Sequence, residues 1–287
     1  MVSTLDDPGL ATIKLLATDL DGTLLRPDGS VSLRTVASLA LARANGLPVV
    51  FVTGRPPRWL PDVVAATDHA GPVVCANGAL LVDVSLDGRV ELMHRETLAA
   101  AALSETVTRL RTRFPGIGFA VERGFPDAGL VEFGVESHYV ARWPMPDTPR
   151  GDVLELAEGG GVIKLLARLP AGSAYDADTF VTGAHDAVAD LVEVTHSNSA
   201  DVLLEMSALG VTKASMLARY ATTLGIAAPL VAACGDMPND VPMLAWAGFA
   251  YAIEGGHPHA QAVGRPLPRP ELDGIAQLLD AIASRST

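Results

Sequence analysis

The sequence predicts a doubly wound α/β fold built on a parallel sheet, into which a second domain of the α+β class is inserted. Three observations carry this prediction. Four short apolar runs lack polar alternation, helical patterns lie between them, and a central stretch is richer in alternating strand patterns. The 287 residues also suffice for one large or two modest domains.

The four apolar runs share one design, which predicts strands that are buried on both faces of a parallel sheet. Each run is rich in Val, Leu or Ala, and each leads into a polar residue with a glycine close by. The runs are KLLATDL (14–20), LPVVFVTGR (47–55), GPVVCANG (71–78) and PLVAACGD (229–236), and their polar ends are Asp19, Thr53, Asn77 and Asp236.

Helical patterns accompany these predicted strands. Residues 32–46 begin with Ser32 as a predicted N-cap, continue with apolar residues at helical spacing, and stop at Gly46. Residues 211–225 repeat this arrangement between Thr212 and Gly225. Strands that alternate with helices predict the doubly wound sheet.

The inserted domain is predicted over residues 85–195, which leaves a discontinuous core of 1–84 and 196–287. SLDGR suggests a hairpin that turns at Asp87-Gly88. Further strands are expected at IGFAVERG, GLVEFGV, VIKLLARL and LVEVTHS, helices at LAAAALSETVTRLRTRF and DADTFVTGAHDAVADL, and a loop at WPMPDTPRGD.

Ligands of open α/β sheets bind beyond the carboxyl ends of the strands. We therefore expect Asp19, Thr53, Asn77 and Asp236 to meet in one crevice, although they are far apart in the sequence. Asp19 and Asp21 lie two residues apart, so in extended chain their carboxylates share one face and repel unless a cation compensates.

A calcium loop also begins with two alternate aspartates, but it needs Gly at position 6 and Glu at position 12. Counted from Asp19, these positions hold Leu24 and Ser30, so the calcium interpretation fails. The other alternative, an acidic surface turn, would leave Asp19 inside an apolar strand without a partner.

A second acidic group begins at Asp236, directly after the last of the four predicted strands. Asn239 and Asp240 come within four residues of it, and alone they would also fit a helix cap. Together the two groups fit Mg²⁺, which takes few carboxylates and often a substrate phosphate. Asp19, Asp236 and the backbone carbonyl of Asp21 would bind the ion, with Asp240 and Asn239 orienting them.

Two further elements suit a phosphate group. Thr53 and the Gly54 amide offer donors at the end of a strand, and Lys213 lies at a predicted helix N-terminus. If either residue stood alone, an ordinary turn threonine or a solvated lysine would be the favoured interpretation.

Composition limits the partners. The net charge is −12, from 33 acidic and 21 basic residues, which argues against nucleic acid and anionic membranes but allows a small anionic substrate beside a metal. Neither a signal peptide nor a membrane span is recognisable. With only Cys75 and Cys234, which we expect to be buried hydrophobes, a cytoplasmic setting is expected.

Four stretches of the chain resemble the four motifs of the haloacid dehalogenase superfamily of phosphohydrolases. DLDGTL is similar to the first motif, VTGR to the second, GVTKASML to the third and GDMPNDVPML to the fourth. The large insertion after the second motif and the G-D-x-x-N-D form of the fourth resemble its Cof-like branch. The resemblance covers essentially the whole chain and implies a Rossmann-like core with an inserted α+β cap domain.

The resemblance also implies roles for individual residues. Asp19 would be the nucleophile, and Asp21 the general acid and then the general base. The phosphoryl oxygens would be held by Thr53, Lys213 and Asn239, and the Mg²⁺ site would be completed by Asp236 and supported by Asp240. Apart from the resemblance, the Gly54 amide is a candidate phosphate donor, and Arg55 and Asn77 are candidate substrate contacts.

One loop departs from the branch, which usually carries an Asn-Ala pair and then a lysine after the last strand. Here Glu254, Gly255, Gly256 and His257 occupy that loop. The polar candidates for substrate choice in the cap are Glu132, His138, Arg142 and Arg123, although for each of them a solvated surface residue is the favoured interpretation.

The sequence thus predicts a Mg²⁺-dependent phosphatase of small phosphomonoesters, such as sugar phosphates or phosphorylated cofactors, acting through an aspartyl phosphate. A phosphomutase of the same superfamily and a phospho-aspartate switch without catalytic turnover are the alternatives. The physiological substrate and the oligomeric state are not indicated.

Overall fold

The computed structural model describes residues 4–125, 132–140, 147–170, 172–198 and 202–285. The chain divides into two compact units, one formed by Met1–His94 with Lys213–Thr287 and the other by Arg95–Thr212. The predicted α/β fold class with a parallel sheet is confirmed. No helix of the described residues is long and apolar enough to cross a membrane.

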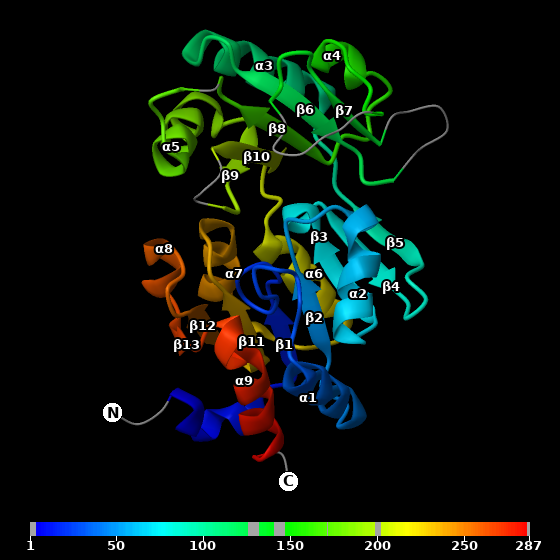
Figure 1. The fold of residues 1–287 in the computed structure, drawn as a ribbon, viewed down its shortest axis with the longest axis vertical. Coiled ribbons are helices and arrows are strands. Elements are labelled where there is room, and N and C mark those ends of the chain that lie inside the picture. The colour runs from blue at the N-terminus through cyan, green and yellow to red at the C-terminus, as the bar shows by residue number, and fades with distance from the viewer. Residues whose placement is uncertain (1–3, 126–131, 141–146, 171, 199–201, 286–287) are drawn as a thin grey trace. The chain divides into compact units, whose positions relative to one another are not determined.

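The first unit is built on an eight-stranded sheet in the order β13-β12-β11-β1-β2-β3-β4-β5 (Figure 1). The strands from β13 to β3 run parallel, and β4 returns antiparallel to β3. Their bounds are β1 Leu15–Thr18, β2 Val49–Val52, β3 Gly71–Cys75, β4 Leu80–Val84, β5 Val90–Arg95, β11 Val231–Gly235, β12 Phe249–Ile253 and β13 Arg265–Leu267.

Both faces of the central strands are buried, as their apolar sequences predict. On one face Ala17 and Val52 share a core with Leu217 and Met243 of the helices α6 and α7. The alternate residues, such as Leu16 and Phe51, are buried as well. The helices of this unit are α1 Leu33–Ala44, α2 Leu60–Thr67, α6 Lys213–Thr223, α7 Val241–Trp246, α8 Pro258–Gln261 and α9 Gly274–Ala283.

Strand β1 lies at the centre of the sheet, and this position fixes the backbone of Asp19 at its end. Ala17 is paired with Ala233 of β11 on one side and with Val50 of β2 on the other. The sheet pairing continues beyond the strand, because the Asp19 N–H donates to the Cys234 carbonyl at 2.9 Å. Asp19 therefore follows a strand that is paired on both sides, and its own backbone is hydrogen-bonded to β11.

Local signals set the ends of the helices. Ser32 caps α1, since its hydroxyl accepts a hydrogen bond from the Thr35 N–H at 3.0 Å. Gly46, with a φ of 72°, ends the helix in the left-handed region that favours glycine. Cys75 and Cys234 are buried free cysteines, as predicted.

The second unit is an antiparallel sheet in the order β7-β6-β8-β10-β9, with helices packed on one face (Figure 1). The sequence did not predict β10, whose Glu205 and Ser207 are buried polar residues that obscure the apolar pattern. The bounds are β6 Gly118–Glu122, β7 Phe133–Val135, β8 Lys164–Arg168, β9 Val192–Thr195, β10 Leu203–Ala208, α3 Ala100–Arg113, α4 Val153–Leu156 and α5 Ala177–Val188.

The boundaries between the two units, at 94/95 and 212/213, lie later in the sequence than the predicted boundaries at 84/85 and 195/196. The first unit extends to His94 because β5, the second strand of the predicted hairpin, continues the first sheet. The second unit extends to Thr212 because β10 pairs with β8 and β9 of its own sheet.

Arg123 is buried and binds backbone carbonyls, so its interpretation as a solvated surface residue is wrong. The buried guanidinium donates from Nε to the Gly160 carbonyl at 2.8 Å and from Nη2 to the Leu156 and Glu158 carbonyls at 2.7 and 3.0 Å. It thereby binds the carbonyl end of α4 and the glycine turn after it.

Glu132 and His138, two of the other candidates for substrate choice, are less deeply buried than Arg123. The His138 ring lies 3.0 Å from the Ile117 carbonyl and is half exposed. The Glu132 carbonyl accepts from the Arg123 N–H. Arg142 lies outside the described residues.

We expect Arg123→Gln to destabilise the second unit by about 2–4 kcal/mol, because buried carbonyls lose charged donors. Calorimetric thermal unfolding of the full chain measures this loss. Arg150→Gln, at an exposed position, is the matched control and is expected to change stability by less than about 0.5 kcal/mol. Equal melting curves for the two variants would contradict the structural role of Arg123.

Candidate active site

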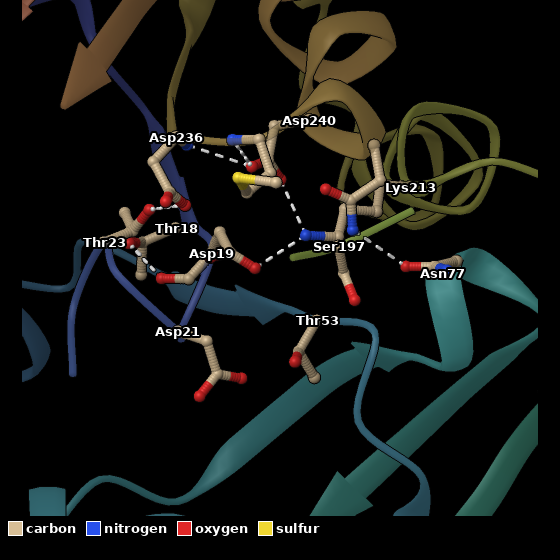
Figure 2. Close-up of polar contacts among 12 residues, drawn as sticks. Thr18, Asp19, Asp21, Thr23, Thr53, Asn77, Ser197, Lys213, Asp236 and Asp240 are labelled. Atoms are coloured by element: carbon tan, nitrogen blue, oxygen red, sulfur yellow. Dashed lines mark hydrogen bonds and ion pairs between the residues drawn. The ribbon is translucent and has the colours of Figure 1, made fainter. Parts of the chain in front are cut away.

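Polar residues at the carboxyl ends of four strands meet in the first unit (Figure 2). Asp19, Thr53, Asn77 and Asp236 lie at or directly after the ends of β1, β2, β3 and β11. The Asn77 N–H donates to the Thr53 carbonyl at 3.0 Å, and carboxylate oxygens of Asp19 and Asp236 lie within 4.8 Å of each other. The structure thus brings together residues that are more than 200 positions apart, as the parallel sheet predicts.

Gly22 and Thr23, which follow Asp19, have the residue types that the tight turn after β1 requires. Gly22 has a φ of 80°, and a Cβ atom at this position would lie 2.6 Å from Asp236 Oδ2. The buried Thr23 hydroxyl donates to Asp236 Oδ1 at 3.0 Å. Thr23 was missed as a site residue, although its place in DLDGTL was a signal.

Lys213, the first residue of α6, is buried between two carboxylates. Its Nζ lies 2.6 Å from Asp19 Oδ1 and 2.6 Å from Asp240 Oδ1 (Figure 2). Burial opposes the charge of this lysine, but Asp19 and Asp240 outweigh it and raise its pKa. Lys213 is therefore a fixed positive charge beside Asp19.

Asp240 positions the loop after β11. Its Oδ2 accepts the N–H groups of Asp236 and Met237 at 3.0 and 2.9 Å, while Oδ1 contacts Lys213. Gly235 permits this close packing, since a Cβ atom there would lie 2.4 Å from Asp240 Cβ. Both carboxylate oxygens are thus engaged within the protein, which fits the predicted supporting role.

The cluster carries more negative charge than Lys213 offsets. Oxygens of Asp19, Asp236 and Asp240 all lie within 4.8 Å of one another. Burial raises the pKa of Asp19 well above its usual range despite Lys213, and burial together with Asp240 raises the pKa of Asp236 to about 7. Three carboxylates around one cation form a donor set of the kind that binds a divalent ion.

Asp19 and Asp236 have the oxygens that could bind such an ion. Lys213 engages Oδ1 of Asp19, and Thr23 engages Oδ1 of Asp236. Within the described part of the chain, the Oδ2 atoms of these two carboxylates accept no hydrogen bond. All-oxygen coordination of this kind suits a hard cation.

Two amides join the ends of β3 and β11. Asn239 Nδ2 donates to Asn77 Oδ1 at 3.1 Å, and both side chains are buried. Ala76 and Asn77 have φ values of 52° and 58°, which non-glycine residues adopt only at a cost of about 1–3 kcal/mol each. The Asn239 Oδ1 atom is buried without a hydrogen-bond partner among the described residues.

Asp21 lies apart from the buried cluster. Arg55 donates from Nε to Asp21 Oδ2 at 2.8 Å and from Nη2 to Asp21 Oδ1 at 2.6 Å. The Asp21 side chain is 55% exposed, whereas that of Asp19 is 7% exposed. Arg55 and Asp21 were both predicted for the site from the sequence, but their pairing was not.

The loop that departs from the family pattern packs against Asp236. The His257 N–H donates to the Asp236 carbonyl at 2.7 Å, and a Cβ atom at Gly256 would lie 2.8 Å from the same oxygen. His257 Nδ1 accepts from the His259 N–H at 3.2 Å and caps the short helix α8. This loop therefore supports the backbone of a candidate metal ligand.

Comparison with known proteins agrees with the geometry. A model of the haloacid dehalogenase-like hydrolases matches residues 16–125 and 161–279. A phosphoglycolate phosphatase of Methanothrix thermoacetophila is 25% identical over 272 residues, which is 93% of this chain and 96% of that protein. An HMP-PP phosphatase of Escherichia coli O157:H7 is 26% identical over 261 residues, 89% of each.

The fold of the chain is also similar to that of a solved protein. BT1666 of Bacteroides thetaiotaomicron, a phosphatase of the HAD superfamily, superposes with a TM-score of 0.74 at 22% sequence identity, covering 95% of this chain and 96% of that one. This likeness extends over both units, each of which therefore has a counterpart in a solved relative. The resemblance inferred from the four motifs is confirmed.

Without divalent cations, we expect the protein to lose stability as the pH rises from about 4 to about 7. The folded-state pKa of Asp236 lies above the ordinary 3.8, so its contribution is present at low pH and lost as the carboxylate ionises. The loss is at most a few kcal/mol, since one pKa unit is worth about 1.4 kcal/mol. Adding MgCl₂ should restore stability above this range and have little effect below it.

Calorimetric melting temperatures of wild type, Asp236→Asn and Asp28→Asn test this expectation. Asp236→Asn should remove the part of the pH dependence that Asp236 contributes, leaving that of Asp19, and should remove most of the gain from MgCl₂, whereas Asp28→Asn, an exposed control, should keep both. A gain from MgCl₂ that is the same in wild type and Asp236→Asn would contradict binding at this cluster.

Proposed function

We propose that this chain, which belongs to the haloacid dehalogenase-like hydrolases, is a Mg²⁺-dependent phosphatase of small phosphomonoesters that acts through an aspartyl phosphate. It is an enzyme of the phosphatase class. The proposal adds the ion, the substrate class, the covalent route and the role of each residue. The relatives named for phosphoglycolate and for HMP-PP support a small phosphorylated metabolite as the substrate.

One observation carries the proposal: a buried lysine and three carboxylates share one cluster at the ends of β1 and β11. A surface turn would not bury Asp19 in this way. A phosphoryl group needs positive charge for its oxygens and a nucleophile in line with the bond that breaks. This cluster offers the lysine for the first requirement and Asp19 for the second.

Asp19, Asp236 and the backbone carbonyl of Asp21 would hold Mg²⁺ in this proposal. When bound, the ion would offset negative charge on the phosphoryl oxygens and on the carboxylates. Lys213 would hold phosphoryl oxygens from one side, while Thr53, the Gly54 amide and Asn239 would donate to them from the ends of neighbouring strands.

The covalent route divides the reaction into two transfers at phosphorus. In the first, an oxygen of Asp19 bonds to phosphorus while the bond to the leaving oxygen breaks, and Asp21, released from Arg55 and in its protonated form, gives that oxygen its proton. In the second, Asp21 takes a proton from water, the water oxygen bonds to phosphorus, and the bond to Asp19 breaks. Phosphate leaves, and both aspartates return to their starting states.

The pairing of Arg55 with Asp21 adds one requirement to this route. Both oxygens of Asp21 accept hydrogen bonds from the guanidinium, so Asp21 can reach a leaving group only after Arg55 releases one of them. The phosphoryl group of a substrate is itself a preferred partner of arginine. Arg55 would then be a substrate contact, the candidate role that the sequence analysis gave it.

The second unit would act as the cap that selects the leaving group, and Asn77 would orient Asn239 toward the phosphoryl site. The cytoplasm is the proposed location, because Cys75 and Cys234 are free thiols. Nucleic acid and membranes are not proposed as partners of a chain with a net charge of −12.

We expect the chain to release phosphate from members of a panel of phosphorylated metabolites, and a chelator to abolish this until Mg²⁺ is restored. Asp19→Asn should reduce release to background, because an amide is a poor nucleophile of nearly the same shape. Acid quench and borohydride reduction should convert the acyl phosphate at Asp19 to homoserine, identified by peptide mass.

Asp28→Asn, an exposed aspartate near the same turn, is the matched control and should retain wild-type turnover. Homoserine at another position, or near-normal turnover of Asp19→Asn, would contradict the covalent role. Accumulation of an isomerised sugar phosphate instead of free phosphate would indicate a phosphomutase, and a stable phosphoprotein without turnover would indicate a switch.

Asp21→Asn should slow turnover of alkyl phosphates by about 10²–10⁴-fold, the usual contribution of general acid–base catalysis. The first transfer should be much less impaired with a nitrophenyl ester, whose leaving group needs no proton. The rate of the pre-steady-state burst of nitrophenol release measures that transfer alone. An equal loss for both substrates in the burst would argue against Asp21 as the general acid.

A further inference from the structure

The first sheet ends in an unusually open edge strand. Strand β5 has six residues, Val90–Arg95, without proline, and ends the sheet beyond β4. Leu92 and Met93 are 43% and 53% exposed on this strand. Long edge strands with exposed apolar side chains are ready templates for pairing with another strand.

The other edge strands that the structure describes are blunted in the usual ways. At the far edge of the same sheet, β13 has three residues, and Pro266 at its centre has no N–H to donate. In the second unit, β7 has three residues and β9 has four. Among these four edges, β5 combines the greatest length with exposed apolar residues.

A second copy of the chain is the occupant that fits this edge by symmetry. Two copies of β5 can pair antiparallel about a two-fold axis perpendicular to the sheet. Directly opposed residues of an antiparallel pair point to the same face of the sheet. In such a symmetric pair one residue must therefore lie directly opposite its own copy, and the axis passes midway between these two copies.

Two registers then pair equal lengths of β5, and charge distinguishes them. With Met93 facing itself, Glu91 lies opposite Arg95 of the second copy, and this pair occurs twice. With Leu92 facing itself, Glu91 lies opposite Met93, and Arg89 of one copy lies opposite Arg95 of the other. Cross-strand opposite charges stabilise a pair and like charges destabilise it, so the Met93-centred register is favoured.

We propose that the protein forms a two-fold symmetric dimer in which the β5 strands of two copies pair antiparallel about Met93 and continue the sheet from one copy into the next. Leu92 would lie beside His94 of the second copy, and two Glu91–Arg95 pairs would flank the central methionines. Glu91, whose side chain is 57% exposed, also lies 3.0 Å from Arg89 of its own strand. This proposal is independent of the phosphatase mechanism.

Sedimentation velocity of the full chain across a range of concentrations tests the dimer. Glu91→Arg should raise the dissociation constant about tenfold or more, because two attractive cross-strand pairs become repulsive. The double variant Glu91→Arg with Arg95→Glu reverses both charges of each pair and should restore dimerisation. Met93→Lys, which places two like charges at the axis, should also give monomers.

Glu271→Arg is the matched control, because it makes the same change of net charge at an exposed position away from β5 and should leave the dimer unchanged. Arg95 also lies 6.0 Å from the Phe125 ring, so Glu91→Arg is the primary single variant. A monomer at all concentrations, a dimer that Glu91→Arg leaves intact, or a double variant without rescue would each overturn the proposal.

Discussion

The buried position of Lys213 between Asp19 and Asp240 is the constraint on which the site depends. It joins the N-terminus of α6, the end of β1 and the turn after β11 through two contacts of 2.6 Å. A buried ion pair is seldom more stabilising than apolar packing, but removing one partner leaves an uncompensated charge at a cost of about 3–5 kcal/mol. The lysine therefore fixes the positions of the carboxylates more than it stabilises the fold.

Close packing around this ion pair explains several residue types. Gly22 and Gly235 bring backbone against Asp236 and Asp240, where any side chain would clash. Ala76 and Asn77 hold left-handed backbone although neither is glycine. Such concentration of tight contacts and strained backbone is typical of functional sites, because rigid strands on both sides can hold it.

Much of the first unit could be predicted from the sequence, because local and long-range signals agree there. The apolar runs predicted β1, β2, β3 and β11, and the polar residues at their ends predicted which side chains would meet. Ser32 and Gly46 predicted the bounds of α1. These signals depend on a few neighbouring residues and on one rule of sheet topology, so a single sequence carries them.

The features that could not be predicted depend on partners that are remote in the sequence. Strand β10 was missed because Glu205 and Ser207 interrupt its pattern, and these are buried only by neighbouring parts of the folded chain. Arg123 resembled a surface residue, since the carbonyls that it binds come from a glycine turn more than 30 residues later. The pairing of Arg55 with Asp21 likewise spans 34 positions.

The difference between Asp19 and Asp21 shows how two like residues in one short turn acquire separate chemistry. Asp19 is fixed at the end of the central strand, buried, and in contact with Lys213. Asp21 lies beyond the strand, half exposed, and paired with Arg55. A nucleophile must be held in line with phosphorus, whereas a proton carrier must reach the leaving oxygen and then water. The turn at Gly22 separates these environments over two residues, so a buried carboxylate and an exposed one lie within reach of the same phosphoryl group in the proposed route.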